Sequence, residues 1–127
     1  MNSCENFLTV EACALFAQVV PVRIVGLVGR KDLNGKQGYL GGFNAQAKRH
    51  QVALSQGKTT EVEVVAIKPI NVIYPDSTRV RIDGLKTVRH NGRCGMVLKH
   101  DNDSGRYSVQ VSRDEILKLK RENCLCL

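Results

Sequence analysis

The chain has 127 residues, of which 43% are hydrophobic and 24% are charged, and its formal net charge is +7. These proportions are ordinary for a globular protein and exclude an intrinsically disordered chain. The positive charge is spread along the chain instead of forming a basic tail, which suits RNA, DNA or an acidic protein surface as a partner, with plain solubility as the alternative.

The first 20 residues stand apart from the rest of the chain. Phe7, Val10 and Ala14 recur at helical spacing, although the same stretch also fits an apolar strand. The apolar run 12–20 is far shorter than the roughly 20 residues that span a bilayer, and no basic region marks a secretory signal. We therefore expect a short N-terminal docking segment, helical or extended, and no membrane span.

The remainder of the chain reads as two copies of one unit. Residues 22–74 contain VRIVGL, LNGKQG, RHQVAL and IKPINVIY, and residues 80–127 contain VRIDGL, HNGRCG, RYSVQV and LKRENCLCL. Such a repeat sets the architecture before any single motif is considered. We divide the chain into a docking segment (1–20), a first unit (21–75) and a second unit (76–127). The identical aligned pairs are Val22/Val80, Arg23/Arg81, Ile24/Ile82, Gly26/Gly84, Leu27/Leu85, Asn34/Asn91, Gly35/Gly92, Gly38/Gly95, Arg49/Arg106, Val52/Val109, Lys68/Lys120 and Asn71/Asn123.

Within each unit, alternation of apolar and polar residues predicts half-buried strands. Turn signals separate these strands, and the Asn-Gly pairs are the strongest of them because both residues tolerate positive φ. About five short strands in 50 residues favour a small closed barrel, so we predict an all-β fold of two tandem five-stranded barrels. The alternating residues expected to face the core are Val62 and Val64, Val80 and Ile82, and Val109 and Val111.

The linker between the units is short. It comprises residues 74–78 and includes Pro75, which stiffens the backbone. We therefore expect the two barrels to be packed together or nearly fixed in their relative orientation.

The repeat resembles a family of tandem SH3-like modules found in many protist and algal proteins, and it is similar to KOW-type and Tudor-like barrels. The family pattern runs roughly V-x-GL, LNG-x-x-G, GRY-x-V and a closing Lys-x-x-Asn-Leu. The first copy keeps Leu33, Asn34, Gly35 and Gly38, whereas Lys48 and His50 replace the Gly and Tyr of the pattern, and His90 replaces Leu in the second copy. The resemblance implies barrels that bind RNA, ribosomal components or peptides. The matching residues of the second copy are Val80, Gly84, Leu85, Asn91, Gly92, Gly95, Gly105, Arg106, Tyr107, Val109, Lys120 and Asn123.

The residues that commonly carry chemistry form no recognisable site in this sequence. Gly57-Lys58-Thr59 lacks the preceding glycine of a phosphate-binding loop, and Cys124 and Cys126 form one cysteine pair where structural zinc normally uses two. Aligned with the end of the first copy, these cysteines read as a closing strand. The odd number of cysteines favours a reducing intracellular compartment. We expect no enzyme activity, cofactor, metal or small-molecule substrate.

Two functions remain. The first is a non-catalytic assembly protein that docks onto protein partners within a larger complex, which could be a ribonucleoprotein. The second is RNA or DNA binding through the basic loop rims of the barrels, with strong salt dependence. For Arg49 and Arg106 we favour structural support, with each head group capping a loop carbonyl, and we expect Tyr107 to be a barrel residue. The candidate contact residues are Arg30, Lys31, Lys36, Lys48, Arg49, Lys58, Lys86, Arg89, Arg93, Lys99 and Arg106.

Overall fold

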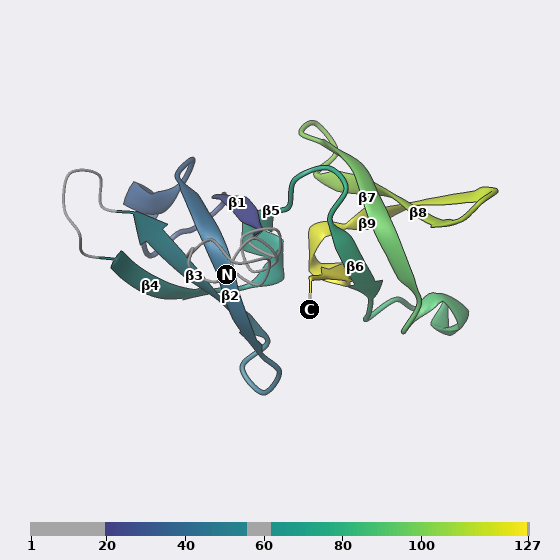
Figure 1. The fold of residues 1–127 in the computed structure, drawn as a ribbon, viewed down its shortest axis with the longest axis horizontal. Coiled ribbons are helices and arrows are strands. Elements are labelled where there is room, and N and C mark those ends of the chain that lie inside the picture. The colour runs from purple at the N-terminus through teal and green to yellow at the C-terminus, as the bar shows by residue number, and fades with distance from the viewer. Residues whose placement is uncertain (1–19, 56–61, 127) are drawn as a thin grey trace, which may run out of the picture.

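The computed structural model describes residues 20–55 and 62–126, and in this part of the chain it has strands and 3₁₀ turns but no α-helix. Residues 1–19 of the expected docking segment (1–20) and residues 56–61, which include Lys58, therefore lie outside the described residues. The strands form two five-stranded antiparallel sheets, one for each copy of the repeat, which confirms the all-β prediction. Figure 1 shows the two barrel-like sheets side by side.

The two sheets have the same strand order. The first runs β4-β3-β2-β1-β5 and the second β9-β8-β7-β6-β10. A 3₁₀ turn precedes the last strand of each sheet, as η2 (Pro69–Asn71) and η4 (Arg121–Asn123), and η1 (Lys31–Leu33) and η3 (Val88–His90) lie in the long first loops. The strands are β1 (Pro21–Ile24), β2 (Gln37–Asn44), β3 (Arg49–Ser55), β4 (Val62–Ile67), β5 (Val72–Ile73), β6 (Arg79–Ile82), β7 (Cys94–Asp101), β8 (Arg106–Ser112), β9 (Glu115–Lys120) and β10 (Cys124–Leu125).

The asparagines that both copies share brace the long first loop of each barrel. Asn34 accepts a hydrogen bond from the backbone N–H of Leu27 at 2.8 Å and donates one to the carbonyl of the same residue at 2.9 Å. Asn91 makes the same pair of bonds with Leu85, each at 2.9 Å. The glycine that follows, Gly35 or Gly92, has a positive φ, whereas Asn34 itself is extended. The Asn-Gly pair therefore combines an asparagine side chain that bridges the loop with a glycine that makes the turn.

The shared glycines of β2 and β7 allow close strand packing. A Cβ atom built on Gly38 would lie 2.4 Å from Cγ1 of Val52, and one on Gly95 would lie 2.6 Å from Cγ1 of Val109. Carbon atoms cannot approach so closely without repulsion. These two positions therefore exclude any side chain because the valine of the next strand fills the space.

The predicted orientation of β4 is wrong. Val62 and Val64 are 60% and 59% exposed, whereas Ile67 is buried. Ile67 is paired in register with the buried His50, which fixes the odd-numbered side chains of β4 on the core side. Glu63 therefore also points inward, at the end of the barrel, where it forms an ion pair of 3.2 Å with Arg30. By contrast, Val80, Ile82 and Val109 are buried as expected, and Cys124 and Leu125 form the expected closing strand.

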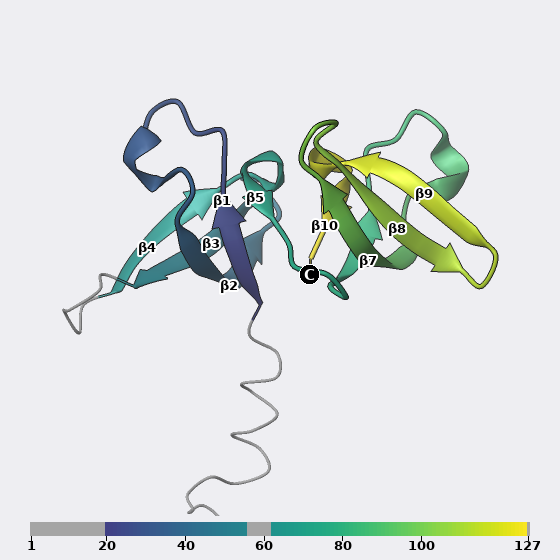
Figure 2. The ribbon, with the colours of Figure 1, turned by 90° about the horizontal axis from the view of Figure 1, so that it is seen from above.

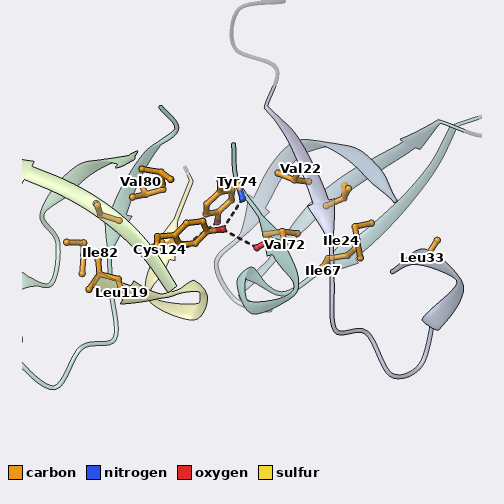
Figure 3. Packing of buried hydrophobic residues seen from close by; sticks show 14 of the residues in the cluster. Val22, Ile24, Leu33, Ile67, Val72, Tyr74, Val80, Ile82, Leu119 and Cys124 are labelled. Carbon is orange, nitrogen blue, oxygen red and sulfur yellow. Dashed lines mark hydrogen bonds between the residues drawn. The ribbon is translucent and has the colours of Figure 1, made fainter. Parts of the chain in front are cut away.

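Two tyrosines join the barrels. Tyr74 ends the first copy, Tyr107 lies on β8 of the second, and both are almost fully buried. Their rings stack with centroids 5.7 Å apart. The hydroxyl of Tyr107 accepts a hydrogen bond from the backbone N–H of Tyr74 at 2.9 Å and donates one to the carbonyl of Val72 at 3.2 Å. Figure 3 shows these two bonds as dashed lines at the junction. Tyr107 is thus a structural residue, as expected.

The hydroxyl of Tyr74 completes the junction from the other side. It donates to the carbonyl of Cys124 at 3.0 Å and accepts from the backbone N–H of Cys126 at 3.2 Å. The remaining partner is Nε2 of His50 at 2.8 Å. Because the single hydroxyl proton is directed at Cys124, His50 must donate from Nε2. Burial lowers the pKa of His50 to about 4, which keeps its ring neutral.

Further contacts tie the two copies together outside the core. The guanidinium of Arg121 donates a hydrogen bond of 2.7 Å to the carbonyl of Ile70, which joins η4 to η2. The linker itself is folded, since the hydroxyl of Thr78 donates to the carbonyl of Pro75 at 2.7 Å. The bond between η4 and η2 shows the two barrels packed against each other, as expected, and Figure 2 shows β10 at the boundary between them.

Candidate binding groove

The structure divides the predicted contact residues into several groups. Arg30 forms ion pairs with Asp32 at 3.0 Å and Glu63 at 3.2 Å, and Arg93 forms one of 3.1 Å with Glu115. These two arginines are therefore held by acids of the same barrel. Lys58 lies outside the described residues. Lys31, Arg49, Arg89 and Lys99 are exposed and lie outside the two grooves described below, and Lys36 lies in a small depression beside Arg30.

Lys48 lines one larger groove, and Lys86 and Arg106 line a second groove that adjoins it. One groove lies where the barrels meet, and we call it the junction groove. It has a volume of about 740 Å³ and receives Lys48 and Lys68 from the first copy and Arg81 from the second. Its remaining lining residues are Phe43, Ala45, Ala47, Pro69, Ile70, Asp83, Gly84, Glu122, Asn123 and Leu125.

A second groove continues from the first along the outer face of the second barrel, and we call it the β9 groove. It has a volume of about 510 Å³ and shares Gly84, Glu122 and Asn123 with the junction groove, so the two adjoin. Four cations line it: Lys86 from the loop before η3, Arg106 from β8, and Lys118 and Lys120 from β9. The others are Leu85, Thr87 and Leu119.

Strand periodicity places the lysines of β9. Leu119 is buried, whereas Lys118 and Lys120 are exposed, as the alternating sequence Leu-Lys-Leu-Lys requires of a strand with one face on the core. Register then sets Lys120 opposite Arg106 and Lys118 opposite Ser108. The cations that β8 and β9 contribute to the β9 groove therefore share one face of these two neighbouring strands.

Two like charges face each other at the end of this sheet. Arg106 and Lys120 are directly paired across β8 and β9, and like charges in that position destabilise a sheet. The first copy has Arg49 and Lys68 at the equivalent positions, one residue beyond the pair His50 and Ile67. Within residues 20–55 and 62–126, none of these four side chains forms an ion pair or side-chain hydrogen bond, so the expectation that Arg49 and Arg106 cap loop carbonyls is wrong.

Sequence reasoning missed four groove cations, namely Lys68, Arg81, Lys118 and Lys120. The predicted contact residues were cations in or beside expected turns, whereas these four lie on strands or at the ends of strands. For Lys68, Arg81 and Lys120 the signal was present in the repeat itself, because Arg23/Arg81, Arg49/Arg106 and Lys68/Lys120 are the cationic pairs among the identical positions. The fold explains the shared glycines and asparagines, and it leaves Arg81, Arg106 and Lys120 exposed to solvent.

Other positions on the outward faces of the two sheets carry apolar side chains. Tyr39 is paired with Ala53 and Ala53 with Val64, which forms a row across β2, β3 and β4. Tyr39 is 42% exposed and Val64 is 59% exposed. The equivalent row of the second barrel holds Met96 and Ile116, with Ile116 55% exposed. We call these the outer-face rows, and rows of this kind often mark protein contacts.

In the described part of the chain, no helix is long and apolar enough to cross a membrane, and no cluster of three or more His, Cys, Asp or Glu side chains could hold a metal ion. The described histidines are engaged in structural contacts, since His50 binds Tyr74, His90 binds Arg93 and His100 binds Asn102. Comparisons with protein-family models and with curated proteins find no match to this chain.

Proposed function

We propose that this protein is a non-catalytic interaction subunit, whose two barrels dock as one rigid body onto partners within a larger complex. The observation that carries the proposal is the tyrosine junction. Tyr74 and Tyr107 bond to the backbone of the opposite barrel as well as stacking on each other. Because buried hydrogen bonds are costly to break, surfaces on both barrels keep a constant spacing that a partner can recognise.

The outer-face rows support a protein as one of these partners. Monomeric proteins usually scatter exposed apolar residues, whereas here the exposed Tyr39 and Val64 of the first barrel have exposed apolar counterparts, Met96 and Ile116, at the equivalent positions of the second. The two adjoining cationic grooves contain none of the residues of the outer-face rows. They support a second partner that is polyanionic. A subunit of a ribonucleoprotein would use both kinds of surface.

Sedimentation of the tagged protein in native extract tests this function. We expect it to sediment with an assembly far larger than its own 14.1 kDa. The double variant Val64→Lys with Ile116→Lys removes the exposed apolar groups and should release the protein from the assembly. Val28→Lys is the matched control, since Val28 is 81% exposed and lies on neither row. Wild-type protein that sediments only as a free 14.1 kDa species would contradict the proposal.

A further inference from the structure

We propose that the junction groove and the β9 groove together bind the sugar-phosphate backbone of a nucleic-acid strand. This inference rests on the proposed function and names one partner of the complex. The two grooves adjoin through Gly84, Glu122 and Asn123, so one extended ligand can follow both.

The charge of the combined groove is strongly positive. Its lining contains seven cations and two acids, Asp83 and Glu122. In residues 20–55 and 62–126, no ion pair joins these cations to an acid, so their charge is available to a ligand. The cations are Lys48, Lys68, Arg81, Lys86, Arg106, Lys118 and Lys120.

The arrangement fits a polymer better than a small anion. The cations come from both barrels, and the tyrosine junction fixes the distance between the two sets. A single phosphate would contact only a few of them, whereas a strand with a charge on every residue can meet all of them in turn. Fixing the barrels before binding also removes an entropic cost of association.

The lining favours a nucleic acid over an acidic protein. Protein contacts depend on apolar or aromatic anchors buried in pockets, and the β9 groove is lined mainly by charged and polar residues. Interfaces with nucleic acids are more polar and more positive. In the junction groove, the half-buried Phe43 and the partly exposed Ile70 lie beside Lys48 and Lys68, where a base or sugar could rest while phosphates meet the lysines.

The like-charge pair Arg106 and Lys120 supports the same conclusion. Arg106 and Lys120 face each other across the strands without an acid between them, at a cost to the sheet. A phosphate placed between two such cations would relieve their repulsion. In the first copy, Arg49 and Lys68 stand at the equivalent sequence positions, and Lys68 lines the junction groove.

Fluorescence anisotropy with a labelled, mixed-sequence single-stranded RNA tests the proposal. For seven phosphate contacts, a plot of the logarithm of the association constant against the logarithm of the salt concentration should have a slope of about −5. The double variant Lys118→Gln with Lys120→Gln should bind about tenfold more weakly, with a slope about 1.4 shallower. Lys31→Gln with Lys36→Gln removes the same charge outside both grooves and should change the affinity by less than about threefold.

Three outcomes would overturn the proposal: wild-type protein that does not bind the RNA at low salt, an equal loss of affinity in the groove variant and its control, or tighter binding of polyglutamate than of RNA. Single-stranded DNA and duplex RNA in parallel identify the preferred strand. Sedimentation of the groove variant in native extract separates this proposal from the proposed function. If the variant loses RNA affinity and stays in the assembly, the docking function stands independently, whereas a wild-type protein that binds RNA but no assembly supports only the groove.

Discussion

The backbone N–H of Tyr74 donates a hydrogen bond of 2.9 Å to the hydroxyl of Tyr107, 33 residues later and in the other barrel. The same hydroxyl donates to the carbonyl of Val72. One phenol therefore satisfies two buried backbone groups of the first copy from a strand of the second. We propose that this connection makes the tandem repeat a single body and so sets the spacing between the surfaces of the two barrels.

Removal of this hydroxyl should loosen the junction. Tyr107→Phe leaves the N–H of Tyr74 and the carbonyl of Val72 without their partner, and each unsatisfied buried group costs about 1–3 kcal/mol. We expect urea denaturation to show a loss of stability of at least about 1 kcal/mol. The control Tyr39→Phe removes a hydroxyl from an exposed side chain and should change stability by less than about 0.5 kcal/mol. Equal effects of the two substitutions would contradict this role of Tyr107.

The stability of the protein should fall on acidification because of His50. Its pKa is lowered to about 4 by burial, against an ordinary value of 6.5 in the unfolded chain. Between these values the unfolded state binds the proton and the folded state does not, so the free energy of unfolding decreases as the pH falls through this window. The full difference corresponds to about 3 kcal/mol.

Denaturation midpoints measured from pH 7 to pH 4 check this expectation. In His50→Gln the titrating group is absent, so this part of the pH dependence should disappear even though the variant is less stable at pH 7. A variant that retains the wild-type pH profile would show that another group is responsible.

Replacement of Lys48 by glycine should stabilise the first barrel. Lys48 has φ 54°, whereas the equivalent position in the second copy is Gly105 with φ 72°. A left-handed conformation costs a non-glycine residue about 1–2 kcal/mol, and the extra flexibility of glycine in the unfolded chain offsets part of this gain. We expect Lys48→Gly to gain about 0.5 kcal/mol in urea denaturation. Lys48→Ala removes the same charge but keeps the strain, so a gain of equal size there would refute the backbone explanation.

Stability and binding should respond in opposite directions to a change at Lys120. Lys120→Glu places an acid opposite Arg106, and an opposite-charge pair across two strands contributes about 0.2–1 kcal/mol. We therefore expect a higher denaturation midpoint, a gain that shrinks at high salt, and a weaker affinity for RNA. Lys31→Glu, on an exposed residue outside the grooves, should alter neither property to the same extent. A less stable Lys120→Glu variant would show that the pair is not strained.

The scaffold could be predicted from the sequence because its signals are local. Asn34 and Asn91 brace loops whose ends lie only seven and six residues away, and their spacing repeats in both copies. The face of β4 could not be predicted in this way. Val62 and Val64 alternate with acids as a buried face would, but the register with β3 turns Ile67 inward instead.

The candidate site was less predictable for a related reason. Search for cations in turns identified Lys48, Lys86 and Arg106, whereas Lys118 and Lys120 become neighbours of Arg106 only through strand pairing. The tyrosine junction depends on contacts between residues that are far apart in the sequence, and the periodicity of the sequence does not predict such contacts. Neither the groove nor the tyrosine pair is visible until both barrels are placed together.

The measurement that tests the central claim most directly is backbone ¹⁵N relaxation of the full chain. If the tyrosine junction makes the two barrels one rigid body, residues of β1–β5 and residues of β6–β10 should report a single rotational correlation time and one diffusion tensor. Two shorter and different correlation times, one for each sheet, would mean that the barrels reorient independently and would contradict the account.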